Sequence, residues 1–263
     1  MNEIKVVLFT AALHTNLTDM KKLIFGLLFS ACFLLTGCID IVEEMTLNKN
    51  GKGTYTFTID MSSILQLASM KDLMNQAGAD EEAQKKLGMD KMEKDTTIYF
   101  KDMPADLRAE TGNPDFWKKA QMNMKMSEKD KKLVMQMRLD FDKIEDIEFF
   151  FKNLTKVMKE GAGELGGMPT EGLAPTAVAF KLAKKSLTRL PTPKAENAPS
   201  GEDLEMMKMF LGTAKYKTIY NLPNRVKKTK IPNAKIDGNT VTVENSMLDI
   251  MEGKAKLDGE ISF

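Results

Sequence analysis

The sequence predicts an α+β protein whose mostly antiparallel sheet is built from hairpins and packed against a few helices. Segments of alternating apolar and polar residues come in pairs around polar turns, which is typical of β-hairpins. A further segment spaces its apolar residues three and four apart, as an amphipathic helix does. Strands and helices do not alternate regularly along the chain, so a parallel βαβ sheet is not favoured.

The first hairpin is predicted over residues 41–47 and 55–61, which flank the pair Asn50-Gly51. This pair accepts the positive φ of a tight hairpin turn. Alternation in both segments places their apolar residues on one face, and we expect that face to be buried.

The chain after this hairpin is predicted to be helical and then irregular. Ser62 is a suitable N-cap, and apolar residues recur at helical spacing up to Gly78. Residues 80–87 are charge-rich and predicted to be helical, and residues 97–100 to form a short strand. Two prolines and a glycine predict a loop over residues 104–114.

A second hairpin and a helix are predicted next. Residues 122–126 and 133–141 alternate around a polar turn. Asp142 and Glu145 have the spacing of a capping box, with Asp142 as the cap. The helix after it is expected to bury Ile144, Ile147, Phe151, Leu154 and Met158, and Phe149 is the apolar exception on its polar face.

The C-terminal third is predicted to be rich in strands. Gly, Pro and Thr predict a loop over 161–175, and Pro, Asn and Ser predict another over 191–201. The other expected elements are a strand over 178–182, a helix over 202–211 and strands over 216–222, 241–243 (after an Asp237-Gly238 turn) and 257–263.

This organisation divides the chain into four parts. They are a leader and signal peptide over 1–37, an N-terminal α+β part over 38–160, a linker-rich region over 161–201 and a C-terminal strand-rich part over 202–263. We expect the last part to share one domain with the N-terminal part.

Composition excludes several classes of chemistry. The 263 residues include 38 basic and 37 acidic ones, so the chain lacks the charge excess of a nucleic-acid binder, and no nucleic-acid partner is expected. His14 and Cys32 lie in the leader, which leaves residues 38–263 with Cys38 as their one cysteine and without histidine. Ser-His-Asp and Cys-His nucleophiles, His/Cys zinc sites and internal disulfides are therefore excluded there, and no cofactor is expected.

The leader has the pattern of a signal peptide. Lys21 and Lys22 precede an uncharged run from Leu23 to Thr36, and small residues end it. A helix of this length spans about 21 Å, short of the ~30 Å hydrocarbon layer. Residues 1–19 would make an unusually long charged region, so either Met20 is the true start or the chain has a genuine long leader.

The end of this segment, Leu35-Thr36-Gly37-Cys38, resembles the lipobox of bacterial lipoproteins. The resemblance covers residues 20–38. It implies that Cys38 receives a diacylglyceryl thioether, that the chain is cut before Cys38 and that the new amino group is acylated. Cys38 is thus the expected lipidation site, and it attaches the protein to a membrane of the bacterial cell envelope. Ile39 in the following position favours the outer membrane.

Three further patterns have a functional and a structural interpretation. Gly161, Gly163 and Gly166 form a G-x-G-x-x-G, but they follow a predicted helix instead of a strand, so a helix end and linker are favoured over a dinucleotide site. Methionines are the ligands of soft Cu(I), yet their period-2 spacing also suits a pleated core face, which we favour. These methionines are Met122, Met124, Met126, Met135 and Met137, with a further group at Met206, Met207 and Met209.

The third pattern is a basic segment between Glu205 and Asp237. It contains no acidic residue, and it is suited either to an anionic partner or to the solvated edge of a sheet. Its basic residues are Lys208, Lys215, Lys217, Arg225, Lys227, Lys228, Lys230 and Lys235.

Two short stretches are similar to the opening and closing elements of uncharacterised α+β envelope lipoproteins. They are residues 47–55 and 222–226, the latter followed by the Asp237-Gly238 hairpin. The resemblance implies the fold class and no functional residue beyond Cys38.

We therefore expect a lipid-anchored, non-catalytic module that binds an envelope protein or lipid. The alternatives are a carrier of lipid or another apolar ligand, which needs a cavity, and a hydrolase that uses two carboxylates converging in one cleft.

Overall fold

The computed structural model describes residues 39–63, 93–127, 129–161, 178–192 and 211–263. The chain divides into two compact units, Met1–Thr36 and Gly37–Phe263, and all the described residues belong to the second. The predicted helices at 62–78, 80–87 and 202–211, and the predicted loops at 161–175 and 191–201, lie largely outside the described residues.

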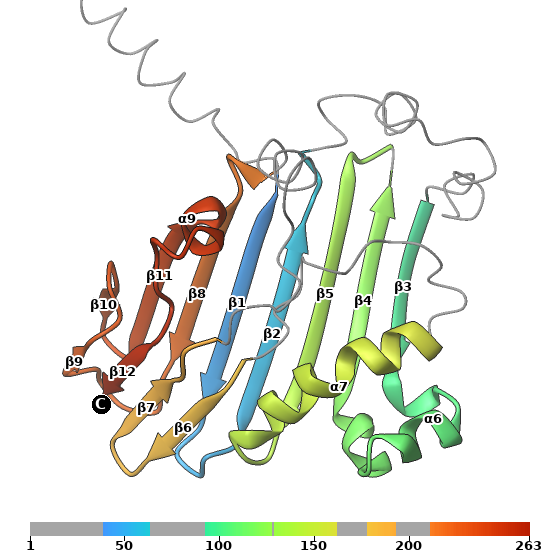
Figure 1. Cartoon of the computed structure of the whole chain (residues 1–263), viewed down its shortest axis with the longest axis horizontal. Helices are drawn as coiled ribbons and strands as arrows, with labels where there is room; N and C mark the ends of the chain where they lie inside the picture. Colours follow the sequence, from blue (N-terminus) through green and yellow to red (C-terminus); the bar gives the residue numbers. More distant parts are fainter. Residues whose placement is uncertain (1–38, 64–92, 128, 162–177, 193–210) are drawn as a thin grey trace, which may run out of the picture. The chain divides into compact units, whose positions relative to one another are not determined.

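The second unit is an α+β fold around an eight-stranded sheet, as predicted (Figure 1). The spatial order is β10-β11-β8-β1-β2-β5-β4-β3; β1 and β8 are parallel and the other neighbours antiparallel. The strands are β1 (Asp40–Leu47), β2 (Gly53–Asp60), β3 (Glu93–Tyr99), β4 (Ala120–Ser127), β5 (Lys132–Phe141), β8 (Lys215–Asn221), β10 (Lys235–Asp237) and β11 (Thr240–Ser246).

A four-stranded sheet and three α-helices complete the described fold. The small sheet has the order β6-β7-β12-β9. It and α7 cover the same face of the large sheet in Figure 1. The elements are β6 (Phe180–Ala183), β7 (Ser186–Arg189), β9 (Lys228–Thr229), β12 (Gly259–Ser262), α6 (Ala105–Glu110), α7 (Glu145–Gly161), α9 (Met247–Met251) and the 3-10 helices η2 (Phe100–Asp102) and η3 (Pro114–Lys119).

The main core lies between the large sheet and this cover. Alternation places every second side chain of β1, β2 and β5 on the inner face, where they are buried. The Phe151 ring of α7 contacts Tyr55 and Phe57 edge-on, with ring centroids 5.6 and 6.1 Å apart. Phe180 of β6 likewise contacts Tyr55, at 6.4 Å. Aromatic rings thus attach both cover elements to the central strands.

The two ends of the large sheet are distinguished below by the direction of β1. The proximal end contains Asp40, where β1 begins, and Lys215, which is its neighbour on parallel β8. The distal end contains Leu47, where β1 ends, together with the β1–β2 turn and the Gly238 turn. Figure 1 shows the start of β1 at the top.

Two sequence predictions are wrong in detail. Residues 104–114 are not one loop, because α6 and η3 occupy most of the segment from 105 to 119. Pro104 caps the start of α6, Gly112 follows its end with φ +78° and Pro114 opens η3. These residues therefore mark the boundaries of two short helices, because prolines and glycines occur at helix ends as well as in loops.

The short strand predicted at 97–100 starts four residues earlier and ends one residue earlier in the structure. It runs over Glu93–Tyr99, because the Phe100 side chain turns into the core with η2 and contacts Trp117 at 5.5 Å between ring centroids. Phe149, the apolar exception on α7, packs against the same group of rings, 4.6 Å from Phe116. Its apolar side chain is thus explained by η3.

Candidate functional site

The described fold begins directly after the predicted lipidation site. Cys38 itself lies outside the described residues. Ile39, its neighbour, is 4% exposed, and its carbonyl accepts a hydrogen bond from the Lys215 backbone N–H at 3.1 Å. β1 begins at Asp40. Since consecutive Cα atoms are about 3.8 Å apart, no flexible linker separates Cys38 from the sheet.

The helix α9 lies at this same proximal end (Figure 1). The Met247 N–H donates to the Ala214 carbonyl at 2.9 Å, next to the residue that pairs with Ile39. Met247, Ile250 and Met251 share one helical face, i, i+3 and i+4, and pack against the core. Leu248 is half-buried, and it is not among the described residues that pack against the core.

A hollow of about 240 Å³ opens beside α9. It is lined by Gly212–Lys215 and by Glu244–Ser246. Lys215 Nζ and Glu244 Oε1 form an ion pair across it at 3.3 Å. The Asn245 side chain is 9% exposed, and its Nδ2 meets no acceptor among the described residues. The hollow is smaller than the roughly 300–1,000 Å³ of pockets for drug-sized ligands.

The carboxyl group of Asp40 lies at the same end and is partly desolvated. Burial raises its pKa above the ordinary value, repulsion from Asp60 adds to this, and Lys215 opposes it.

A buried ionic centre joins the two sheets. Arg189 of β7 donates from Nη1 to both carboxylate oxygens of Glu43 on β1, at 2.8 and 2.7 Å. The Tyr216 hydroxyl donates to the same carboxylate at 2.6 Å, and Arg189 also donates to the Tyr220 hydroxyl at 3.2 Å. The guanidinium lies 5.8 Å from the centre of the Phe180 ring. Both charged side chains are almost fully buried.

The environment of this centre keeps its arginine charged and its tyrosines neutral. Burial alone lowers the pKa of Arg189, but the Glu43 carboxylate and the surrounding tyrosines raise it well above its ordinary value. Burial raises the pKa of Tyr216 strongly and that of Tyr220 to about 12. The centre is closed to solvent, so it is suited to holding the small sheet in place and not to binding a substrate.

Sequence reasoning missed this centre, although it contains one local signal. Glu43 occupies an inward position between Ile41 and Met45, where the alternation calls for an apolar side chain. Its partner Arg189 belongs to β7, within the region predicted to be rich in linkers. A charged residue in an apolar row indicates a buried partner, but does not identify it.

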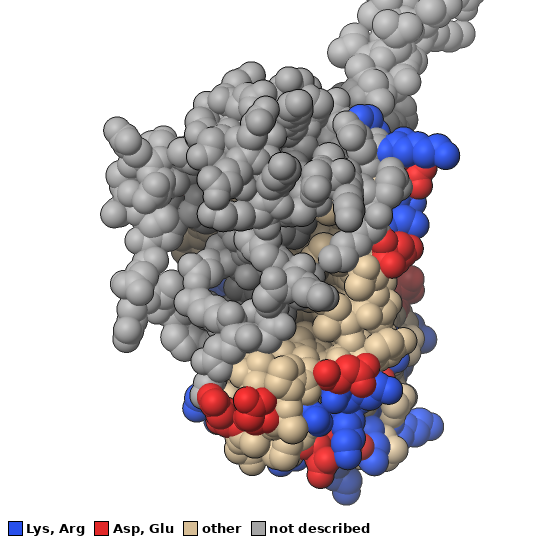
Figure 2. Space-filling view, turned by 90° about the vertical axis from the view of Figure 1, so that its right-hand side faces the viewer, with Lys and Arg blue, Asp and Glu red and all other residues tan. Residues whose placement is uncertain are grey.

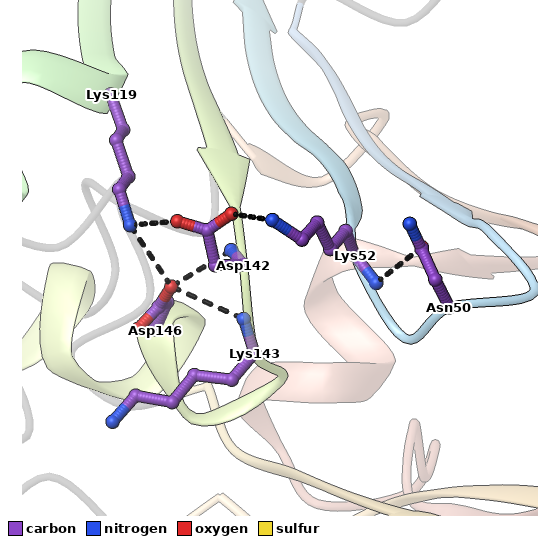
Figure 3. A network of polar contacts seen from close by, with 6 residues as sticks. All are labelled: Asn50, Lys52, Lys119, Asp142, Lys143 and Asp146. Atoms are coloured by element: carbon purple, nitrogen blue, oxygen red, sulfur yellow. Dashed lines mark hydrogen bonds and ion pairs between the residues drawn. The ribbon is translucent and has the colours of Figure 1, made fainter.

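An exposed network lies at the distal end (Figure 3). The Asp142 carboxylate accepts hydrogen bonds from Lys52 Nζ, at 2.8 Å, and from Lys119 Nζ. Asp146 Oδ2 accepts from the backbone N–H groups of Asp142 and Lys143, at 2.9 and 3.3 Å. The prediction of Asp142 as the helix cap is therefore wrong: α7 begins at Glu145, the two lysines engage the Asp142 carboxylate, and Asp146 of the first helical turn binds N–H groups that precede the helix.

The hairpin methionines lie on the inner face of the large sheet. Met122 pairs with Met137 and Met124 with Met135 in the β4–β5 register, and each is at most 6% exposed. The period-2 spacing thus fits a buried pleated face, as we favoured. Met206, Met207 and Met209 lie outside the described residues.

The basic segment does not form one patch. Lys215 lies at the proximal end, whereas the Val226 N–H bonds the Gly238 carbonyl in the distal turn. Lys230 pairs with Glu260 at 2.8 Å, and Lys227 Nζ contacts the Phe263 carbonyl at 3.3 Å. Figure 2 views the molecule from the side of β3 and α6, the right-hand side of Figure 1, and shows basic and acidic side chains intermingled over its described part.

The remaining candidates give no site among the described residues. Within them, no group of three or more His, Cys, Asp or Glu could hold a metal ion. Gly163 and Gly166 lie outside the described part of the chain, and Gly161 is the last residue of α7. Of the helices described, none has the length and apolar character needed to cross a bilayer.

Comparison with known proteins gives no family. No protein-family model and no curated protein matches the chain. Among solved structures, the chain is similar to the NMR structure of the folded domain of the LppM protein of Mycobacterium tuberculosis. The TM-score is 0.36 and the identity 10%, over 86% of this chain and 88% of that one.

Proposed function

We propose that this protein is a lipid-anchored lipoprotein of the bacterial envelope whose folded domain is a non-catalytic binding module. The observation that supports this best is the sequence Leu35-Thr36-Gly37-Cys38, which a folded sheet follows directly at Ile39. A cut before Cys38 would separate the leader from an intact domain, because β1 begins two residues later.

The free energy of burying acyl chains in the bilayer makes a lipidated Cys38 a sufficient anchor. Each buried methylene of an acyl chain contributes about 0.8 kcal/mol, so two or three long chains on one residue hold a protein almost permanently. The folded domain then needs no membrane-spanning segment, and its surface is available for a partner. We propose an envelope protein or lipid as that partner and the outer membrane as the location.

The absence of histidine and of a free cysteine after cleavage favours binding over catalysis. After cleavage, no histidine remains, and the thiol of Cys38 is consumed by the lipid. Among the described residues, the buried pair Glu43 and Arg189 is closed to solvent, so it offers no reacting group to a substrate. Turnover of a substrate by the purified protein, lost on substitution of a carboxylate, would contradict the non-catalytic part of the proposal.

The anchor is tested by Cys38→Ser, with Cys32→Ser as the matched control. In cells fed labelled palmitate, we expect the Cys38 variant to lose the label and to accumulate as an uncleaved precursor. The Cys32 variant should be labelled and cut like the wild type, because that residue lies inside the discarded leader. Wild-type protein recovered in soluble form without acyl mass would overturn the proposal.

The binding role is tested by crosslinking in intact cells. Wild-type protein and the Cys38→Ser variant are compared, and specific partners should be crosslinked to the wild type in the envelope fraction. Wild-type protein that is crosslinked to neither protein nor lipid in intact cells would contradict a binding module.

A further inference from the structure

We infer that the proximal end of the large sheet is a membrane-contacting surface, and that Leu248 of α9 enters the headgroup region of the bilayer that holds Cys38. This inference rests on the proposed anchoring at Cys38 and adds to it an orientation for the domain. The occupant is the bilayer itself, and contact with Leu248 is apolar.

The first argument is the length of the tether. Ile39 is already bonded to Lys215 in the sheet ladder, so the chain has no free residue between Cys38 and the folded domain. Acyl chains on Cys38 must lie in the hydrocarbon layer, which brings Cys38 to the headgroup level. The proximal end of β1 therefore lies against the membrane surface, whatever the rest of the domain binds.

The second argument is the position of α9. β1, β8 and β11 are consecutive strands of the sheet, and α9 follows β11 directly. Two strand spacings amount to about 10 Å, so Met247 lies about this far from Ile39 along the sheet. A bilayer that touches the start of β1 is thus within reach of α9.

The third argument is the chemistry of the helix. Met247, Ile250 and Met251 turn one face to the core, which leaves Leu248 on another face, where it is partly exposed and does not pack against the core. An apolar side chain next to a lipid anchor gains from entering the interface, as the apolar faces of interfacial helices do.

The charges around α9 favour apolar over electrostatic contact. Lys215 is paired with Glu244, and Lys254 with Glu252 at 2.5 Å, so both cations already have carboxylate partners. Asp249 adds a further negative charge in the first turn of the helix. An excess of anionic lipid should therefore not strengthen the contact.

The test couples residues 38–263 through Cys38 to a maleimide lipid in phosphatidylcholine vesicles that contain brominated lipid. Cys38 is the sole thiol of this segment, and Trp117, its sole tryptophan, is buried in η3 beside the distal start of β4. In Leu248→Trp, we expect the emission of the added tryptophan to fall roughly twofold or more, as for a side chain at the headgroup boundary. Wild-type emission should not change.

Lys49→Trp is the matched control, because Lys49 is exposed in the turn at the other end of β1. β1 is eight residues long, so this position lies roughly 25 Å from the proximal end, and its emission should stay unquenched. Equal quenching of both variants, or none in Leu248→Trp, would overturn the inference. Stronger quenching with added anionic lipid would replace apolar contact by electrostatic docking and overturn it as well.

Hydrogen exchange of the unsubstituted, coupled protein is a second readout that needs no folding of a variant. The amides of Met247–Met251 should exchange more slowly on vesicles, and those of residues 48–52 should not change. Chemical coupling gives Cys38 a lipid whether or not cells acylate it, so this test can fail independently of the proposed function. The intact mass of cell-made protein reports acylation, whereas quenching and exchange report the orientation of the domain.

Discussion

Two charge networks join distant segments of this domain, one buried and one exposed. In the first, Arg189 and Glu43 are 2% and 0% exposed, with 2.7 Å between the nearest nitrogen and oxygen. In the second, Lys52 and Asp142 are 56% and 50% exposed, with 2.8 Å between their atoms. The distances are nearly equal, so the environment of each pair decides its contribution to stability.

The physics of desolvation explains the expected difference. A buried charge whose partner is removed keeps its desolvation cost without compensation. An exposed charge regains water, and salt screens its interactions within about 8–10 Å. We therefore expect the buried network to be the main polar link between the two sheets and the exposed one to affect stability mainly through pH.

The largest effect is expected for Arg189→Met, which leaves the Glu43 carboxylate buried and unpaired. It should lower the free energy of unfolding by about 3–5 kcal/mol, as measured by urea denaturation. Arg138→Met is the control, because Arg138 pairs with Asp140 on the exposed face, and it should cost at most about 1 kcal/mol.

The double variant Glu43→Met/Arg189→Met distinguishes the cost of an unpaired buried charge from the cost of lost packing around the guanidinium. Removal of both charges should recover most of the loss, since a buried pair and its apolar replacement are often close in stability. A double variant as unstable as Arg189→Met alone would show that the loss came from packing around the guanidinium, and would break the comparison between the two networks.

The second effect compares two buried tyrosines of the same face. Tyr216→Phe removes a hydrogen bond to the Glu43 carboxylate and should cost about 1.5–3 kcal/mol in the free energy of unfolding. The hydroxyl of Tyr55 is buried near the same carboxylate, which helps to raise its pKa, but it makes no hydrogen bond of good geometry among the described residues, so Tyr55→Phe should cost clearly less than Tyr216→Phe. Equal losses in both variants would contradict a specific role for the Tyr216 hydroxyl.

The third effect concerns the start of α7. Asp146→Ala removes the carboxylate that accepts from the backbone N–H groups of Asp142 and Lys143 just before α7, and the loss of these hydrogen bonds should cost about 1 kcal/mol. Asp146→Asn retains an acceptor oxygen and should cost less. An Asn variant as unstable as the Ala variant would indicate that the negative charge, which also lies 3.9 Å from Lys119, is the main factor.

The sequence was sufficient to predict elements whose signal is local. Both long hairpins and α7 follow from alternation or helical spacing within segments of at most 22 residues, and β8 and β11 follow from the same rule. The α+β class follows from their order, and the structure confirms it. Cys38 stays a prediction, because it lies outside the described residues.

Contacts between distant segments could not be predicted in the same way. Arg189 and Glu43 are 146 residues apart, and their meeting depends on how the small sheet packs on β1. β7 was missed because four residues, Ser186–Arg189, are too short for a reliable alternation signal. Asp142 had the right spacing for a cap, but the two lysines that engage it come from other elements, and no local pattern reveals them.

The smallest effect is a change in pH dependence at the exposed network. Lys119 and Lys52 hydrogen-bond the Asp142 carboxylate and lower its pKa from 3.8 to about 2. A carboxyl group with a lower pKa in the folded state binds fewer protons there than in the unfolded chain, so its stabilisation is present above pH 4 and is lost as the pH falls towards 2. Asp142→Asn should therefore be less stable than the wild type at pH 5, and the difference should shrink by pH 2 in urea titrations at low salt.

Asp115→Asn is the control: a single lysine, Lys118, lowers the pKa of Asp115, so its pH dependence should change less. A difference between wild type and Asp142→Asn that is constant from pH 5 to pH 2 would mean that the two lysines stabilise no charge on Asp142, and that the exposed network only positions the start of α7.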